Sequence, residues 1–132
     1  MSSEIEIPPV LTLAEGLVGL PLTKVLHVTP FADGAFVELQ DADEPALGWF
    51  AASAEDVRPG MTDELRRIGR ITADEVLLVL LGGHGDPPVF TANLAGPVAV
   101  APDGAARQLV LEGAAYELRA HLGRLAPSPA NG

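Results

Sequence analysis

The chain has 132 residues and a formal net charge of −10 at pH 7, from 18 Asp and Glu against 8 Lys and Arg. This excess of acids speaks against direct nucleic-acid binding, because a duplex binder gains affinity by neutralising phosphates with a basic face. Hydrophobic residues make up 48% of the chain, enough for the core of one domain, and the sequence contains no cysteine for disulfides, thiolate nucleophiles or metal ligands.

The predicted elements are short and are separated by Gly, Pro and Asp, a spacing typical of a mostly β domain. Alternation over residues 4–7 (EIEI) and 10–14 (VLTLA) indicates an edge strand interrupted by two prolines. Residues 16–21 (GLVGLP) follow as a loop whose glycines we expect at positive φ. Residues 24–29 and 35–40 are predicted to pair as a hairpin across the Asp33-Gly34 turn, with Pro30 closing the first strand, and residues 46–52 form the next strand.

One short helix is predicted at residues 61–68, with Thr62 as its N-cap and arginines in its last turn. Residues 75–81 are the most apolar stretch and indicate a central strand that ends in a glycine turn at Gly82 and Gly83. Strands at 89–94, 98–101 and 107–112 complete the set, the last two as a hairpin across residues 102–104. The sequence thus predicts one β domain over residues 1–122 and a flexible tail at 123–132.

The negative charge is concentrated in the first part of the chain. Residues 1–57 contain ten acids and one cation, Lys24, a formal charge of −9, whereas residues 58–132 contain eight acids and seven arginines, a charge of −1. Two interpretations stay open. The acids form a solvated face that maintains solubility, or they form a docking face whose negative potential steers a basic partner.

No motif in the sequence indicates a catalytic, metal or cofactor site. His27, His84 and His121 occur singly, without the spacing of metal ligands, and a structural or solvated role is favoured for each. The glycine-rich stretch at 82–86 is followed by two prolines and a strand, where a phosphate-binding loop would need the N-terminus of a helix. We therefore expect a protein that is not an enzyme and that carries no cofactor.

The acidic N-terminus lacks the features of a secretory signal, and the longest aliphatic run, residues 76–81, is far shorter than the roughly 20 residues of a membrane-spanning helix. We therefore expect a cytoplasmic protein without a membrane span. We also expect it to be monomeric when alone.

Five segments in order resemble the flagellar assembly factor FliW family: residues 16–21 (GLVGLP), 36–40 (FVELQ), 45–50 (PALGWF), 91–98 (TANLAGPV) and 108–111 (QLVL). The resemblance covers roughly residues 4–120. It implies a small antiparallel β-barrel-like domain, in agreement with the strands predicted above. It also implies a non-enzymatic regulator of flagellum biogenesis that binds newly made flagellin in the cytoplasm.

By the same resemblance, the factor freed when flagellin is exported binds CsrA, an RNA-binding translational repressor, and relieves repression of flagellin synthesis. Two alternatives are kept beside this partner switch. One is a barrel that binds a small ligand or acts as an enzyme through a pocket near His27 or His84. The other is a domain that binds flagellin alone.

Six residues are candidates for partner binding: Gln40, Asp41, Asp43, Glu44, Asn93 and Gln108. For Gln40 and the three acids of the turn, surface recognition and simple solvation stay equally open. For Asn93 and Gln108, which match family positions, the favoured interpretation is that their amides satisfy backbone groups near the Pro97 break. Tyr116 is expected to anchor the last strand against the barrel.

Overall fold

The computed structural model describes residues 6–31, 33–84, 89–113 and 116–121. Nine strands and two short helices follow one another along the chain. They are β1 (Val10–Leu13), β2 (Val25–Phe31), β3 (Phe36–Asp41), β4 (Gly48–Ser53), α1 (Ala54–Val57), α2 (Met61–Arg67), β5 (Val76–His84), β6 (Val89–Ala92), β7 (Val98–Val100), β8 (Ala105–Gln108) and β9 (Ala120–His121).

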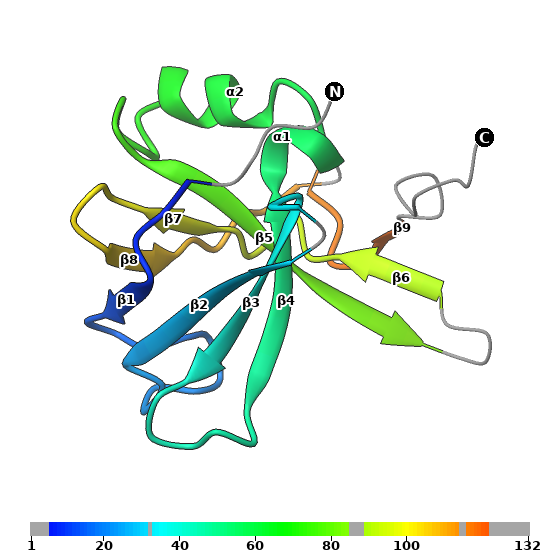
Figure 1. The fold of residues 1–132 in the computed structure, drawn as a ribbon. Coiled ribbons are helices and arrows are strands. Elements are labelled where there is room, and N and C mark those ends of the chain that lie inside the picture. Colours follow the sequence, from blue (N-terminus) through cyan, green and yellow to red (C-terminus); the bar gives the residue numbers. More distant parts are fainter. Residues whose placement is uncertain (1–5, 32, 85–88, 114–115, 122–132) are drawn as a thin grey trace.

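Seven of these strands close into a barrel (Figure 1). The order around the barrel is β4-β3-β2-β1-β8-β7-β5, and β5 pairs back onto β4. Six of the neighbouring pairs are antiparallel. The seventh, between β1 and β8, is parallel, with Thr12 opposite Ala105 and Leu13 opposite Ala106. The predicted mostly β, barrel-like fold is confirmed, with this one parallel contact added.

Strand β5 is longer than the sequence predicts and belongs to two parts of the sheet. Its first residues pair with β7, and its last residues pair with β6, which in turn pairs with the short β9. Gly82 and Gly83 lie in extended backbone opposite Thr91 and Phe90. The predicted turn at these glycines is therefore wrong, because pairing with β6 continues the strand through them.

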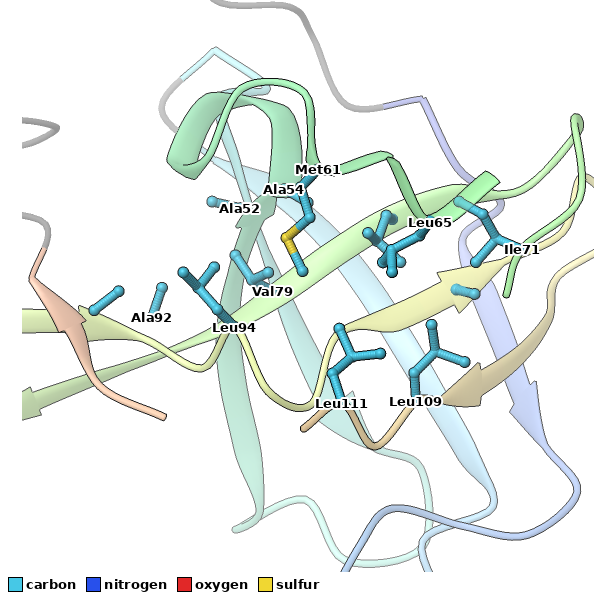
Figure 2. Packing of buried hydrophobic residues seen from close by; sticks show 13 residues of the cluster. Ala52, Ala54, Met61, Leu65, Ile71, Val79, Ala92, Leu94, Leu109 and Leu111 are labelled. Carbon is cyan, nitrogen blue, oxygen red and sulfur yellow. The ribbon is translucent and has the colours of Figure 1, made fainter. Parts of the chain in front are cut away.

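The strands β4, β5 and β7 bury side chains on both faces. Ala51 and Leu78 belong to an inner cluster that fills the barrel, whereas their neighbours Ala52 and Val79 belong to an outer cluster under the helices (Figure 2). Successive residues of a strand point to opposite faces, so this division follows from the pleat. The inner cluster comprises Leu11, Leu13, Leu17, Leu26, Val37, Leu39, Ala51, Leu78, Val98 and Val100.

The helical segment differs from its prediction in two ways. An additional helix, α1, begins after Ser53, whose Oγ accepts a hydrogen bond from the amide of Glu55 at 3.3 Å. Thr62 is not the N-cap of α2, because the helix begins at Met61 and its N-cap position is Gly60, two residues before Thr62, with φ 90°. The Glu55 carboxylate caps α2 instead, accepting from the amides of Gly60 at 3.1 Å and Thr62 at 2.9 Å.

The predicted hairpin of residues 24–29 and 35–40 is confirmed as β2 and β3, with His27 opposite Gln40. Strand β2 continues through Pro30, which was expected to end it. Strand β1 pairs with β2 only from Val25 to His27, so Pro30 needs to supply no hydrogen bond on that edge. Residues 6 and 7 lie outside any strand, while the start of the predicted 4–7 segment and the tail at 123–132 lie outside the described residues.

Each helix within the described ranges is too short to span a bilayer.

Candidate protein-binding surface

The two ends of the barrel differ in structure. Strand β3 starts at Phe36, opposite Ala52 and close to α1, and ends near Gln40, opposite Gly48. The helices therefore lie at one end, and the β1–β2 loop and β3–β4 turn lie at the other (Figure 1). A hydrogen bond from the Ala42 amide to the Val25 carbonyl, 3.0 Å, joins the loop to the turn. We refer to residues 14–24 and 42–47 together as the loop end.

Asp41 organises the β3–β4 turn from inside the protein. Its Oδ1 accepts hydrogen bonds from the amides of Asp43 at 2.9 Å and Glu44 at 3.3 Å, and its Oδ2 accepts from the hydroxyl of the buried Thr23 at 3.1 Å. Asp41 itself is buried. The structure thus separates Asp41, which holds the turn, from Asp43 and Glu44, which are exposed.

Gln40 is exposed on the same turn, and its Nε2 donates to the Pro45 carbonyl at 2.8 Å. This contact spans the turn from its first strand to its middle. Gln40 therefore supports the turn conformation while its side chain remains at the surface.

Asn93 and Gln108 meet at Gly96. The Oδ1 of Asn93 accepts from the amides of Ala95 and Gly96, both at 3.0 Å, and the Nε2 of Gln108 donates to the Gly96 carbonyl at 2.8 Å. The Oε1 of Gln108 accepts from the Val18 amide at 2.8 Å. Both amide side chains therefore satisfy backbone groups, the role that the sequence favours for them.

The β1–β2 loop has a fixed backbone conformation. Leu17 and Leu20 exchange two backbone hydrogen bonds, at 3.1 and 2.8 Å. Gly16 and Gly19 have φ values of 71° and 80°, and a Cβ at Gly16 would lie 2.6 Å from the Pro21 carbonyl oxygen. The predicted positive φ of these glycines is confirmed, and only glycine fits at position 16.

This loop also presents apolar side chains to solvent, which its sequence pattern does not predict. Leu17 is buried in the inner cluster, but Val18 is 66% exposed and Leu22 is 84% exposed. The loop contains no regular alternation that would have marked which side chains point inward. The glycines at positive φ were the available signal, since they indicate a tightly folded loop.

The opposite end of the barrel, which we call the helix end and which is formed by residues 54–67, carries ion pairs and arginines. Arg58 pairs with Glu64, with 2.9 Å between Nη1 and Oε1, and its guanidinium lies 5.2 Å from the centre of the Tyr116 ring. The hydrogen bond from Arg58 lowers the pKa of Glu64, while burial and the nearby Glu64 raise the pKa of Tyr116. Tyr116 packs against the outer cluster, as expected of an anchor for the segment that precedes β9.

Of the histidines, only His27 can be placed by its side chain. His27 is exposed on β2, next to Leu26, which is buried in the inner cluster, so the two side chains point to opposite faces. His84 and His121 end β5 and β9. Within the described residues, no three His, Asp or Glu side chains are grouped so that they could hold a metal ion. The aliphatic inner cluster occupies the barrel, and the pocket alternative near His27 or His84 is not favoured.

The fold defines a class of small, closed seven-stranded β-barrels with two short helices packed on one side. The family model described as FliW protein matches residues 2–122, and the chain belongs to this family. A crystal structure titled as that of the flagellar assembly factor FliW has the same fold, with a TM-score of 0.66 and 22% identity, covering 92% of this chain and 94% of that one.

Two relatives in sequence carry the name flagellar assembly factor FliW. The protein of Geotalea uraniireducens is 32% identical over 123 residues, which span 88% of this chain and 76% of the relative. The protein of Geobacter sulfurreducens is 31% identical over 119 residues, which span 85% of this chain and 75% of the relative.

Proposed function

We propose that this flagellar assembly factor works by partner switching: it binds newly made flagellin and, when flagellin is exported, binds a CsrA-type RNA-binding repressor and relieves repression. The match to the FliW family over residues 2–122 is the observation that carries the proposal. In this proposal the chain acts in the cytoplasm, as a monomer when alone, without catalysis and without contacting RNA.

The charge of the chain supports a basic partner. The exposed acids Asp43 and Glu44 and the outward-facing Glu38 belong to the part of the chain that carries a formal charge of −9. A negative potential steers a basic protein toward the chain and disfavours RNA on that partner. Because the Debye length is about 8 Å at 0.15 M salt, repulsion of RNA requires the acids to lie close to the RNA path.

The test uses three purified proteins: this chain, and the flagellin and CsrA-type protein of the same organism. We expect calorimetry to show a one-to-one complex with each partner, and we expect added flagellin to displace the CsrA-type protein from the chain. A CsrA-type protein released in this way should regain binding to the flagellin messenger RNA leader. If the chain binds neither flagellin nor the CsrA-type protein, the proposal is overturned.

A second candidate, a domain that binds flagellin alone, predicts a different result in the same experiment. Flagellin would then form its complex, while the CsrA-type protein would show no heat of binding at any salt concentration. Repeating the titration at about 0.05 and 0.5 M salt also tests the charge attraction, since we expect the affinity for the CsrA-type protein to fall as salt rises.

A further inference from the structure

We propose that the loop end is the docking site for the CsrA-type partner, and that it receives a segment in which aliphatic side chains are flanked by Lys or Arg. This inference rests on the proposed function and adds to it the location and the chemistry of the contact. Three properties of the loop end carry it: exposed aliphatic side chains, a fixed backbone and an unbalanced negative charge.

The loop end exposes four aliphatic side chains on two neighbouring segments. Val18 and Leu22 are mostly exposed, and Leu20 and Leu47 are exposed by more than a third. The loop and the turn that carry them are joined through Thr23 and Asp41 and through the backbone bond between Ala42 and Val25. Because the loop and the turn adjoin each other, their exposed aliphatic side chains offer an apolar surface that a partner could cover.

The backbone of the loop end is held from three sides. Leu17 anchors the loop in the inner cluster, Gln108 holds the Val18 amide, and Asp41 holds the turn through two amides. Binding therefore orders little new backbone, and less of the contact energy is lost to conformational entropy. A flexible loop with the same side chains would bind more weakly.

The charges at the loop end favour a basic partner. Glu15, Asp43 and Glu44 are exposed there, and the one cation of residues 1–57, Lys24, donates from Nζ to the Ala14 carbonyl at 2.6 Å. The arginines of the helical segment, Arg58, Arg66 and Arg67, lie in or beside α1 and α2 at the other end. The same segment also carries four acids, and Arg58 and Arg66 are paired with Glu64 and Asp63, so its charges nearly balance. The loop end, with three exposed acids and one cation, is the more negative of the two and attracts a basic surface more strongly.

The contact is made by side chains rather than by strand addition. In the barrel, β2, β3 and β4 are paired on the edges that lead to the loop end. Specificity then comes from aliphatic side chains of the partner resting on Val18 and Leu22 while its basic side chains reach Asp43 and Glu44. A segment with aliphatic side chains and flanking acids would fit the same apolar surface but not the charge.

The test measures binding of the full-length chain to the CsrA-type protein of the same organism by calorimetry. We expect Leu22→Ser and Val18→Ser each to weaken the affinity about tenfold, because each removes an exposed aliphatic contact. The matched control is Leu118→Ser, which alters a leucine that is 69% exposed beside β9, away from the loop end. We expect the control to bind like the unaltered chain.

The charge component has its own pair of variants. The double variant Asp43→Lys, Glu44→Lys reverses two exposed charges at the loop end, and Asp74→Lys, Glu112→Lys reverses two exposed charges elsewhere. We expect the first pair to weaken binding at least tenfold and to flatten its salt dependence. The second double variant changes the net charge of the chain by the same amount as the first. We expect it to weaken binding by a smaller factor, because it acts only through the long-range field.

The outcomes separate this inference from the proposed function. If the unaltered chain does not bind the CsrA-type protein, the proposed function itself is contradicted. If the unaltered chain binds and the loop-end variants bind equally well, or if Leu118→Ser weakens binding as much as Leu22→Ser, the loop end is not the docking site. All variants alter exposed side chains, and thermal melting confirms that each is folded before its affinity is measured.

Discussion

Arg107 on β8 binds the carboxylate of Glu75, the residue before β5, in a bidentate manner through the Nε and Nη2 edge of its guanidinium. Its Nη2 lies 2.8 Å from Oε1 and its Nε lies 3.2 Å from Oε2. The same Nη2 also donates to the Arg70 carbonyl at 2.8 Å, and the Thr72 amide donates to Oε1 of Glu75 at 2.8 Å. One ion pair thus ties the connection between α2 and β5 to a strand of the barrel.

We expect Glu75→Gln to lower the free energy of unfolding by about 1–3 kcal/mol. The Glu75 side chain is only 10% exposed, so the variant leaves the Arg107 guanidinium with a weaker, uncharged acceptor. Urea denaturation measures the change. Asp74→Asn, at the exposed neighbouring position, is the control and should change stability by less than about 0.5 kcal/mol.

The stability of the protein should fall as the pH falls below the ordinary glutamate pKa of 4.5. Burial alone would raise the pKa of Glu75, but the hydrogen bonds from Arg107 and Thr72 outweigh it and lower that pKa. A group whose pKa is lower in the folded state stabilises the fold above its unfolded pKa and loses this contribution on protonation. Urea midpoints at pH 6 and pH 3 should therefore differ less in Glu75→Gln than in the unaltered chain, and equal differences would contradict the assignment.

Asp41 and Asp43 are two residues apart but should respond very differently to substitution. Asp41→Ala leaves the buried Thr23 hydroxyl and the turn amides without their acceptor, and we expect a loss of about 2–3 kcal/mol. Asp43→Ala alters an exposed side chain and should stay within about 0.5 kcal/mol. Thermal melting of the two variants in parallel tests this difference, and similar melting temperatures would show that Asp41 does not hold the turn.

Gln108→Ala should loosen the β1–β2 loop without unfolding the barrel. The variant removes the acceptor of the Val18 amide and the donor to the Gly96 carbonyl, at a cost of about 1 kcal/mol. Hydrogen exchange of the Val18 amide should accelerate, because this amide is then open to water. Gln40→Ala, which breaks a hydrogen bond in the neighbouring turn, should leave exchange at Val18 unchanged.

The strands were largely predictable because each buried strand repeats with a period of two or is uniformly aliphatic. The hairpin of β2 and β3 and the apolar β5 follow from that signal alone. The extension of β5 through Gly82 and Gly83 was not predictable, since it depends on pairing with β6. The cap of α2 was missed for a similar reason: Glu55 reaches it from the preceding helix, seven residues before Thr62.

The candidate surface was harder to predict than the fold. Asp41 is close in sequence to Asp43 and Glu44, so all three were predicted to belong to one surface. In the structure the Asp41 side chain is buried and accepts a hydrogen bond from Thr23, so it is not part of that surface. The charge imbalance of residues 1–57 was visible in the sequence, but Glu55 belongs to α1 and caps α2, at the opposite end of the barrel from the loop end. Which leucines face solvent depended on the folded loop, in which Leu17 is buried and Leu22 is 84% exposed.

The hydrogen bond between Val18 and Gln108 joins residues 90 positions apart, and the parallel pair of β1 and β8 spans a comparable stretch. During synthesis, β1 to β4 can form hairpins early, but the barrel closes only once β8 has emerged from the ribosome. Contacts of such high sequence separation form late and slowly. The loop end therefore reaches its final shape only after β8 has been made. If the loop end is the docking site, as proposed, a chain still being synthesised does not yet compete for the partner of the finished protein.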